Sequence, residues 1–271
     1  MTCLSFTLGN FKIYLVMLLF FCQVPLGAQI LFEDDFESGS FEEKWKTHLD
    51  GKTALVEVVS KPVRSGEYAV RMRTSKKGED RRAELVPFID RFKWGEEFWI
   101  GFSMYIKKNL GKAAIIHQHH SIPNNRNWKD CIAGPNSLTF KIKDDKTLQI
   151  LTATDEAYIN AKPPKGAASL YQEALDVPIE QGRWIDVVYH FKYMANDNGF
   201  FQCWINGALV LDDKGANVYK YDVCGKLKIE EQYLKIGLYP ASTGADGELF
   251  YDEIKIGGAK STFKDVSPKS M

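Results

Sequence analysis

The sequence lacks a surplus of charge of either sign. Its 35 lysine and arginine residues balance 35 aspartate and glutamate residues, so the formal net charge at pH 7 is zero. A protein that attracts nucleic acid through its overall field carries a clear basic excess. The balance therefore excludes a broad nucleic-acid-binding surface, and any site for an anion must be a local patch.

The sequence also lacks an apolar run long enough for a membrane anchor. Residues 13–21 are apolar and follow Lys12, but a spanning helix needs roughly 20 such residues. Leu26-Gly27-Ala28 forms a small-residue cleavage site before Gln29. Residues 1–28 are therefore predicted to be a secretory signal peptide, and the mature protein is expected to be secreted or periplasmic, with no membrane attachment.

Cysteine is scarce and lacks metal-binding spacing. After signal cleavage Cys131, Cys203 and Cys224 remain, an odd number that leaves at least one thiol unpaired. One disulfide among the three stays open, although Cys203 lies in a strand pattern and is interpreted as a buried thiol. No Cys-x-x-Cys pair occurs, so a zinc knuckle has no support.

No long helical period of apolar residues is present, and short alternating segments take its place. The even-numbered residues from Phe98 to Ile106 form one apolar face, and the odd-numbered residues from Ile185 to Tyr193 form another. Asn206-Gly207 is a tight-hairpin dipeptide. Many short strands with Gly and Pro turns predict an all-β protein, a jelly roll or concanavalin A-like sandwich.

Neither an internal repeat nor a linker composition divides the mature chain. One domain is predicted over residues 29–259, followed by a polar tail at 260–271. Acidic residues near the start of this domain and in its last strand are weak candidates for a structural Ca²⁺ site, since hard cations prefer several oxygen ligands; they are Glu33, Asp35 and Asp252. The alternative is plain surface charge.

Three segments place chemically active side chains on alternate residues. They are Arg82-Ala-Glu84, Gln118-His-His120 and Tyr233-Leu-Lys-Ile-Gly-Leu-Tyr239. Because alternate residues of a strand share a face, each segment offers its polar groups to one side of a sheet. Glycine at position 237 is interpreted as room for a ligand against the sheet.

The remaining histidines of the second segment, His117 and His119, face the other way from Gln118 and His120. These two residues have the spacing of a His-x-His metal-binding pair, but no third ligand is identifiable by spacing. Both residues are therefore interpreted as packing or hydrogen-bonded side chains.

In order and spacing, the three segments resemble the motifs of jelly-roll polysaccharide lyases. The resemblance is to the heparin lyase I-like and glucuronan lyase families and, more distantly, to the alginate lyases, which share an Arg-x-Glu, a Gln-x-His and a late Tyr-x-Lys-x-Gly-x-Tyr strand. The His-Ser-Ile-Pro-Asn run at 120–124 strengthens the link to the first two. Val86 stands where the alginate type carries a second arginine, which puts alginate in doubt, and Pro240 departs from the polar residue that relatives often carry.

The resemblance implies an enzyme that cleaves a uronic-acid polysaccharide, such as glucuronan, ulvan or a heparin-like chain, by β-elimination. Loss of the C5 proton gives an enolate-like dianion, so donors aimed at the sugar carboxylate stabilise it; Gln118 and Arg82 are the candidates. His120 is implied as base and Tyr239 as acid, although in some relatives the tyrosine serves as both. The further candidate substrate-binding residues are Lys235, Glu84 (which would orient Arg82), Asn124, Arg126, Tyr233 and Arg73.

Two other functions stay open at this stage. A non-catalytic carbohydrate-binding module or lectin would use the same fold, because fold does not fix function. A glycoside hydrolase would need two carboxylates flanking the scissile bond, and no well-placed pair is found. The elimination itself is expected to need no cofactor, and the protein is expected to act as a monomer on an acidic polysaccharide.

Overall fold

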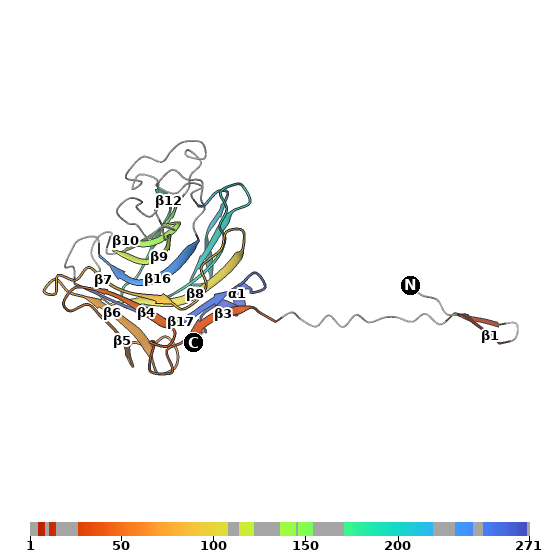
Figure 1. Ribbon diagram of the computed structural model, residues 1–271, viewed down its shortest axis with the longest axis horizontal. Helices are drawn as coiled ribbons and strands as arrows, with labels where there is room; N and C mark the ends of the chain where they lie inside the picture. The colour runs from red at the N-terminus through yellow and green to blue at the C-terminus, as the bar shows by residue number, and fades with distance from the viewer. Residues whose placement is uncertain are drawn as a thin grey trace.

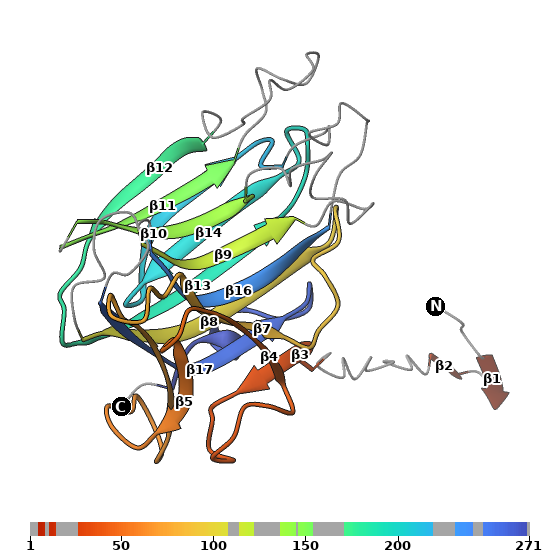
Figure 2. The ribbon, with the colours of Figure 1, turned by 60° about the vertical axis from the view of Figure 1, so that its left-hand side comes forward.

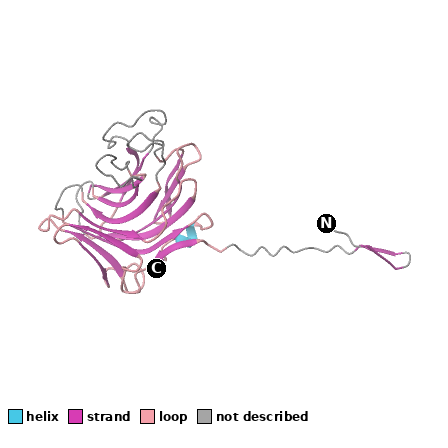
Figure 3. Cartoon of the chain, in the orientation of Figure 1, coloured by secondary structure: helices cyan, strands magenta, loops and turns pink. Residues whose placement is uncertain are grey.

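The computed structural model describes residues 5–8, 11–14, 27–107, 114–121, 136–144, 146–153, 171–218, 231–240 and 246–269 (Figure 1). Within these residues almost all regular structure is β-strand, and one short helix, α1 (Phe263–Val266), follows the last strand (Figure 3). The strands of the main body form two antiparallel sheets that pack face to face. The predicted all-β jelly roll is confirmed.

The first sheet, called the site sheet below, has seven strands (Figure 2). In spatial order they are β12 (Tyr171–Pro178), β11 (Thr147–Ala153), β10 (Leu138–Asp144), β9 (Ile115–Ser121), β16 (Gln232–Tyr239), β7 (Arg82–Pro87) and β4 (Trp45–Asp50).

The second sheet, called the back sheet, has eight strands. In order they are β15 (Ala208–Lys214), β14 (Phe200–Ile205), β13 (Trp184–Lys192), β8 (Glu97–Ile106), β17 (Gly247–Gly257), β6 (Ala69–Thr74) and β5 (Leu55–Val59), with β3 (Ile30–Asp34) pairing beside β17. A separate hairpin of β1 (Ser5–Leu8) and β2 (Phe11–Tyr14) precedes the body (Figure 1).

The core lies between the sheets and is rich in aromatic rings. The even-numbered residues of β8 and the odd-numbered residues of β13 are buried there, as their alternation predicts. Phe102 of β8 lies 5.6 Å from Tyr251 of β17 and 6.3 Å from Phe140 of β10, so rings from both sheets meet. Each such ring removes about 150–250 Å² from water, which makes aromatic burial a major stabilising contribution.

His117 and His119 of β9 point into this core, as interpreted from the sequence. His119 hydrogen-bonds through its two ring nitrogens to the hydroxyls of Tyr193 (2.5 Å) and Tyr189 (2.6 Å), and His117 Nε2 lies 2.7 Å from the Tyr189 hydroxyl. Burial lowers the pKa of His117 to about 3 and lowers the pKa of His119 as well. Both imidazoles are therefore neutral at physiological pH.

The helix α1, in the segment predicted to be a polar tail, packs against the back sheet. Val266 of α1 is fully buried, and the Phe263 ring packs edge-on against Trp204 at 5.4 Å. Gly101 of β8 allows this approach, because a Cβ there would lie 1.9 Å from the carbonyl oxygen of Val266. A tail with interspersed apolar residues thus docks on the back sheet.

Some predictions fall outside the described residues. They include most of the apolar run of the signal peptide, at 15–21, and two of the cysteines, Cys131 and Cys224. Cys203 is described and is a free, buried thiol, as its strand pattern predicted. Among the described residues, no helix has the length and apolar character to cross a membrane.

Candidate active site

A hollow of about 450 Å³ opens on the face of the site sheet that points away from the core. Its volume lies in the range of roughly 300–1,000 Å³ that is typical of ligand pockets. The residues that line it come from four neighbouring strands and one connecting segment: His48, Arg82, Glu84, Ile115, Gln118, His120, Asn136, Tyr233, Lys235 and Tyr239.

Strand register brings the three sequence segments together in this hollow. β16 lies between β9 and β7, so that Lys235 pairs with Gln118, Tyr233 with His120, and Gly237 with Glu84. Since paired residues of adjacent strands point to the same face, the alternate polar residues of all three segments converge on one surface. The sequence motifs are distant in the chain but adjacent in space.

Glu84 is at the centre of the polar contacts. Its side chain is 3% exposed and lies 3.5 Å from Lys235 Nζ and 3.9 Å from the Arg82 guanidinium. Burial raises the pKa of Glu84, while Lys235 and Arg82 oppose the rise; burial likewise lowers the pKa of Lys235, and Glu84 opposes this. Two cations flank one carboxylate, so the hollow carries an excess of positive charge.

The Gln118 side chain is fixed by partners on both sides. Its Nε2 donates to Glu84 Oε1 at 2.5 Å, and its Oε1 accepts from Asn136 Nδ2 at 2.6 Å. This network assigns the orientation of the amide and leaves one N–H of Gln118 for a ligand. Glu84 was expected to orient Arg82, but its closest partner is Gln118.

His120 and Tyr239 line opposite ends of the hollow. His120 lies beside Tyr233, with ring centroids 5.4 Å apart, and Tyr239 lies beside Arg82, whose guanidinium is 5.2 Å from the tyrosine ring centroid. Tyr239 is 37% exposed, so its hydroxyl is accessible from solvent. A sugar bound in the hollow would lie between the imidazole and the phenol.

Tyr233 occupies the wall rather than the opening. It is more than half buried, and burial, followed by the charge of Glu84, raises the pKa of Tyr233 to about 12. The Lys235 ammonium lies 5.7 Å from the centre of its ring. Tyr233 therefore remains a neutral phenol at physiological pH, and its ring forms part of the wall of the hollow.

His48 and Asn136 belong to the site, and sequence reasoning missed both. His48 lies on β4 and pairs with Glu84 of β7. Burial, then the charges of Lys235, Lys46 and Arg82, lower the pKa of His48 to about 4, so it is a neutral imidazole at pH 7. Its Nδ1 is buried and has no hydrogen-bond partner among the described residues, which leaves it available to a ligand.

Gly237 has a different purpose from the one expected. Its φ is +129°, and a Cβ there would lie 2.3 Å from the carbonyl oxygen of Ala83 in β7. The pairing of β16 with β9 also shifts by one residue between Ile236 and Tyr239. The glycine is required by a bulge and by close approach of the β7 backbone, and not by space for a ligand.

One predicted substrate-binding residue, Arg73, does not join the hollow, and the positions of two others are not described. Arg73 is on β6 of the back sheet, opposite Leu55 and Glu248, and is exposed there. Asn124 and Arg126 lie outside the described residues.

The candidate calcium ligands are not gathered into one site. Glu33 lies 3.4 Å from Lys255 and Asp35 lies 3.8 Å from Lys269. Asp252 accepts backbone N–H groups from Arg64 (2.8 Å) and Ser65 (3.3 Å), and burial raises the pKa of Asp252 to about 7. Within the described part of the chain, no group of three or more His, Cys, Asp or Glu side chains is placed to hold a metal ion.

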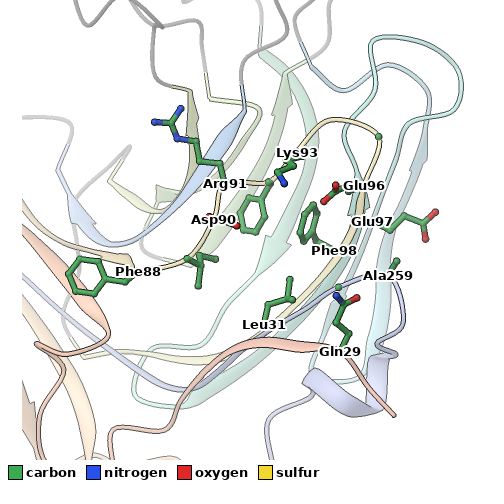
Figure 4. Close-up of a pocket in the computed structure, with 14 residues that line it drawn as sticks. Gln29, Leu31, Phe88, Asp90, Arg91, Lys93, Glu96, Glu97, Phe98 and Ala259 are labelled. Carbon is green, nitrogen blue, oxygen red and sulfur yellow. The ribbon is translucent and has the colours of Figure 1, made fainter. Parts of the chain in front are cut away.

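A larger hollow, of about 670 Å³, lies on the other side of the segment that joins β7 to β8 (Figure 4). Among its lining residues are Leu31, Phe88 and Lys93. None of the histidine, tyrosine or glutamine side chains discussed above reaches it, so its size alone does not make it the better candidate for catalysis.

Solved structures with the same fold include several carbohydrate-active proteins. An endo-β-1,4-glucuronan lyase from the fungus Trichoderma reesei matches with a TM-score of 0.66 and 20% identity, covering 89% of this chain and 99% of that one. A family 7 alginate lyase, A1-II′, matches with a TM-score of 0.55 and 12% identity over 88% and 98%. A cellulose-induced protein, Cip1, matches with a TM-score of 0.53 and 17% identity over 83% and 96%.

These structural similarities establish a shared fold, and the comparison with family models goes further. Among curated proteins no sequence matches this chain. The family model described as "Polysaccharide lyase" matches residues 36–255, which include all three motif segments. The match spans most of the chain and every strand that lines the hollow, and the protein therefore belongs to the polysaccharide lyase family.

Proposed function

We propose that this polysaccharide lyase cleaves a uronic-acid polysaccharide by β-elimination in the site-sheet hollow. One observation carries the proposal: two cations, Arg82 and Lys235, flank the single carboxylate of Glu84, with an imidazole and a phenol at the two ends of the same hollow. The excess positive charge favours an anionic sugar, and the end groups are suited to moving protons.

The sugar carboxylate is bound first. The remaining N–H of Gln118 and the guanidinium of Arg82 are the donors that fit this task, because both are already held in place by Glu84. As the C5 proton leaves, negative charge spreads onto the carboxylate. Fixed donors stabilise that charge without reorganising at the moment of reaction.

Proton transfer then breaks the glycosidic bond. His120 takes the C5 proton, the electron pair forms a C4=C5 double bond, the C4–O4 bond breaks, and Tyr239 gives its proton to O4. Each positioned acid or base contributes about 10²–10⁴-fold. In the alternative assignment Tyr239 performs both transfers, and His120 then contributes only binding.

A hydrolytic mechanism is less well supported. Glycosidases of the usual type use two carboxyl groups roughly 5–9.5 Å apart on either side of the bond. Of the described residues that line the hollow, Glu84 alone carries a carboxylate, and it is buried and held by three partners. Elimination needs no second carboxylate.

The substrate class to test first is polyglucuronate. The fold similarity to a glucuronan lyase supports this choice, as does Val86 in place of the second arginine of the alginate type. Export follows from the same proposal, since a polysaccharide substrate lies outside the cell, and residues 12–28 have the pattern of a signal peptide.

The test is the appearance of the unsaturated product, which absorbs at about 235 nm. Acid–base-catalysed elimination forms this product. The enzyme would be incubated with glucuronan, ulvan, heparin and alginate. We expect absorbance to rise with glucuronan and to stay flat with a Tyr239→Phe variant. Binding of these polymers without any rise would favour the carbohydrate-binding alternative, and new reducing ends without absorbance would favour hydrolysis.

A further inference from the structure

The active-site hollow continues into a smaller hollow of about 230 Å³. His48 and Tyr233 line both, so the two hollows share a wall. The smaller one is bounded further by Lys46 of β4, by Val86 and Pro87 at the end of β7, and by residues 89–91. A polymer that leaves the first hollow past Tyr233 meets the second one.

The position of Arg91 in this second hollow is fixed by the backbone. Phe92 pairs with Gln232 at the start of β16 through two hydrogen bonds, of 2.8 and 3.3 Å. In an antiparallel bridge the flanking residues also face one another, so Arg91 is opposite Tyr233, which in turn is opposite His120. The Phe92 ring is buried against His119, and alternation directs Arg91 to the outer face.

The side chains confirm this direction. In Figure 4, Arg91, which borders that hollow too, extends its guanidinium away from Asp90, Leu31 and Gln29. Lys46 lies in the same hollow, from the opposite side, and precedes His48 by two residues on β4, so both point to the outer face. Arg91 and Lys46 therefore both line the second hollow, one from each side.

Among the described residues, neither cation of this hollow has a counter-ion. Within the part of the chain that the structure describes, neither Lys46 nor Arg91 forms an ion pair, although Asp90 also lines this hollow. Both side chains are exposed. Charges held near one another without a carboxylate between them repel, and an anion bound between them would relieve that repulsion.

We propose that this second hollow is a subsite for the next uronate unit of the polymer, whose carboxylate is bound by Arg91 and Lys46. The inference rests on the proposed function, because it needs a polyuronate chain that passes through the first hollow. It adds a binding position that none of the three sequence motifs contains. His48, with its unpartnered Nδ1, lies at the junction and is placed to contact the sugar on either side.

The matched test compares Arg91→Ala with Lys93→Ala. Lys93 has the same charge, is exposed and lies two residues along the same segment, but lines only the hollow of Figure 4. For long glucuronan chains we expect Arg91→Ala and Lys46→Ala each to raise KM about three- to tenfold with little change in kcat, the pattern of lost uniform binding. Lys93→Ala should stay within about twofold.

Chain length sharpens the test. The effect of Arg91→Ala should shrink for the shortest glucuronan oligomer that is cleaved, because that oligomer does not fill the second hollow, and raised salt should diminish it. Equal losses in Arg91→Ala and Lys93→Ala would overturn the subsite in favour of a diffuse charge effect. So would an Arg91→Ala loss that is independent of oligomer length.

Binding measurements separate this inference from the proposed function. Calorimetric titration of glucuronan oligomers into the Tyr239→Phe variant, with and without Arg91→Ala, needs no turnover. Weaker binding with Arg91→Ala, together with no unsaturated product from the unsubstituted enzyme, would retain the subsite and overturn the lyase mechanism. Normal turnover with unchanged binding would retain the mechanism and overturn the subsite.

Discussion

The two faces of β9 carry the same kind of side chain under opposite conditions. His117 and His119 point into the core, where burial lowers their pKa values and phenol hydroxyls from β13 and from Tyr193 hydrogen-bond to them. Gln118 and His120 point outward into a hollow with excess positive charge. One strand thus combines a structural pair and a functional pair, and only the face distinguishes them.

The comparison shows why a histidine count says little about chemistry. A buried imidazole that is closed off from solvent cannot reach a substrate. An outward imidazole beside an open space retains that capacity. Substitutions on the two faces should therefore have separable consequences, for turnover on one side and for stability on the other.

The largest expected effect is on turnover from the outward histidine. We expect His120→Ala to lower kcat by about 10²–10⁴-fold, because a positioned base is lost, with a melting temperature close to that of the unsubstituted protein. His190→Ala is the matched control, since His190 is on the back sheet and stacks on Trp99. Full activity of His120→Ala, with inactive Tyr239→Phe, would assign both proton transfers to Tyr239.

The outward amide comes next. We expect Gln118→Ala to lower kcat by about 10²–10³-fold, as loss of one preorganised donor does. Gln149→Ala serves as control, because Gln149 is on β11 of the same sheet and bonds to Asp176 at 3.0 Å, outside the hollow. If the two variants lost activity equally, Gln118 would have no special role in binding the sugar carboxylate.

Substitutions on the inward face of β9 should change the stability of the protein. His119→Phe keeps the ring in the aromatic core but removes the partner of the Tyr193 and Tyr189 hydroxyls. We expect a loss of about 1–3 kcal/mol in the free energy of unfolding, the cost of leaving buried hydroxyls unsatisfied, measured by urea denaturation. Activity per folded molecule should be retained; its loss at unchanged stability would contradict the division between the faces.

The last expected effect is a dependence of stability on acid. Folding lowers the pKa values of His117 and His119, so between the unfolded value, near 6.5, and the folded value, about 3 for His117, the unfolded chain binds more protons. Stability is therefore full above pH 6.5 and falls as the pH drops, by up to roughly 1.4 kcal/mol per unit for each histidine. His117→Gln should make the pH dependence of urea unfolding shallower, and an unchanged slope would refute this cause.

Local alternation explains what sequence could predict. The strands β8 and β13, the inward histidines and the three polar segments all follow from a period of two, which is a property of each strand by itself. Arg73 was misplaced because alternation does not say which sheet a strand joins. β6 pairs with β17 and β5, whereas β7, next in sequence, pairs with β16 and β4.

The residues that were missed depend on long-range pairing. His48 is on β4 at the edge of the site sheet, where most side chains are exposed and the alternation is weak. Asn136 precedes β10, lines the hollow and bonds to Gln118. Gly237 was interpreted as room for a ligand because the bulge that requires a glycine becomes evident only when the pairing of β16 with both β7 and β9 is known.

The inward histidines have one more consequence, for the alignment of β9 itself. A slip of this strand by two positions would keep its face assignment, so apolar contacts alone discriminate weakly against it. The bonds to Tyr189 and Tyr193 do discriminate, because a slip by two positions would bring only one of the two imidazoles to these phenols and carry the other away from them. We infer that the buried histidines His117 and His119 fix the register of β9. The core of the fold thereby determines the positions of Gln118 and His120 on the outer face.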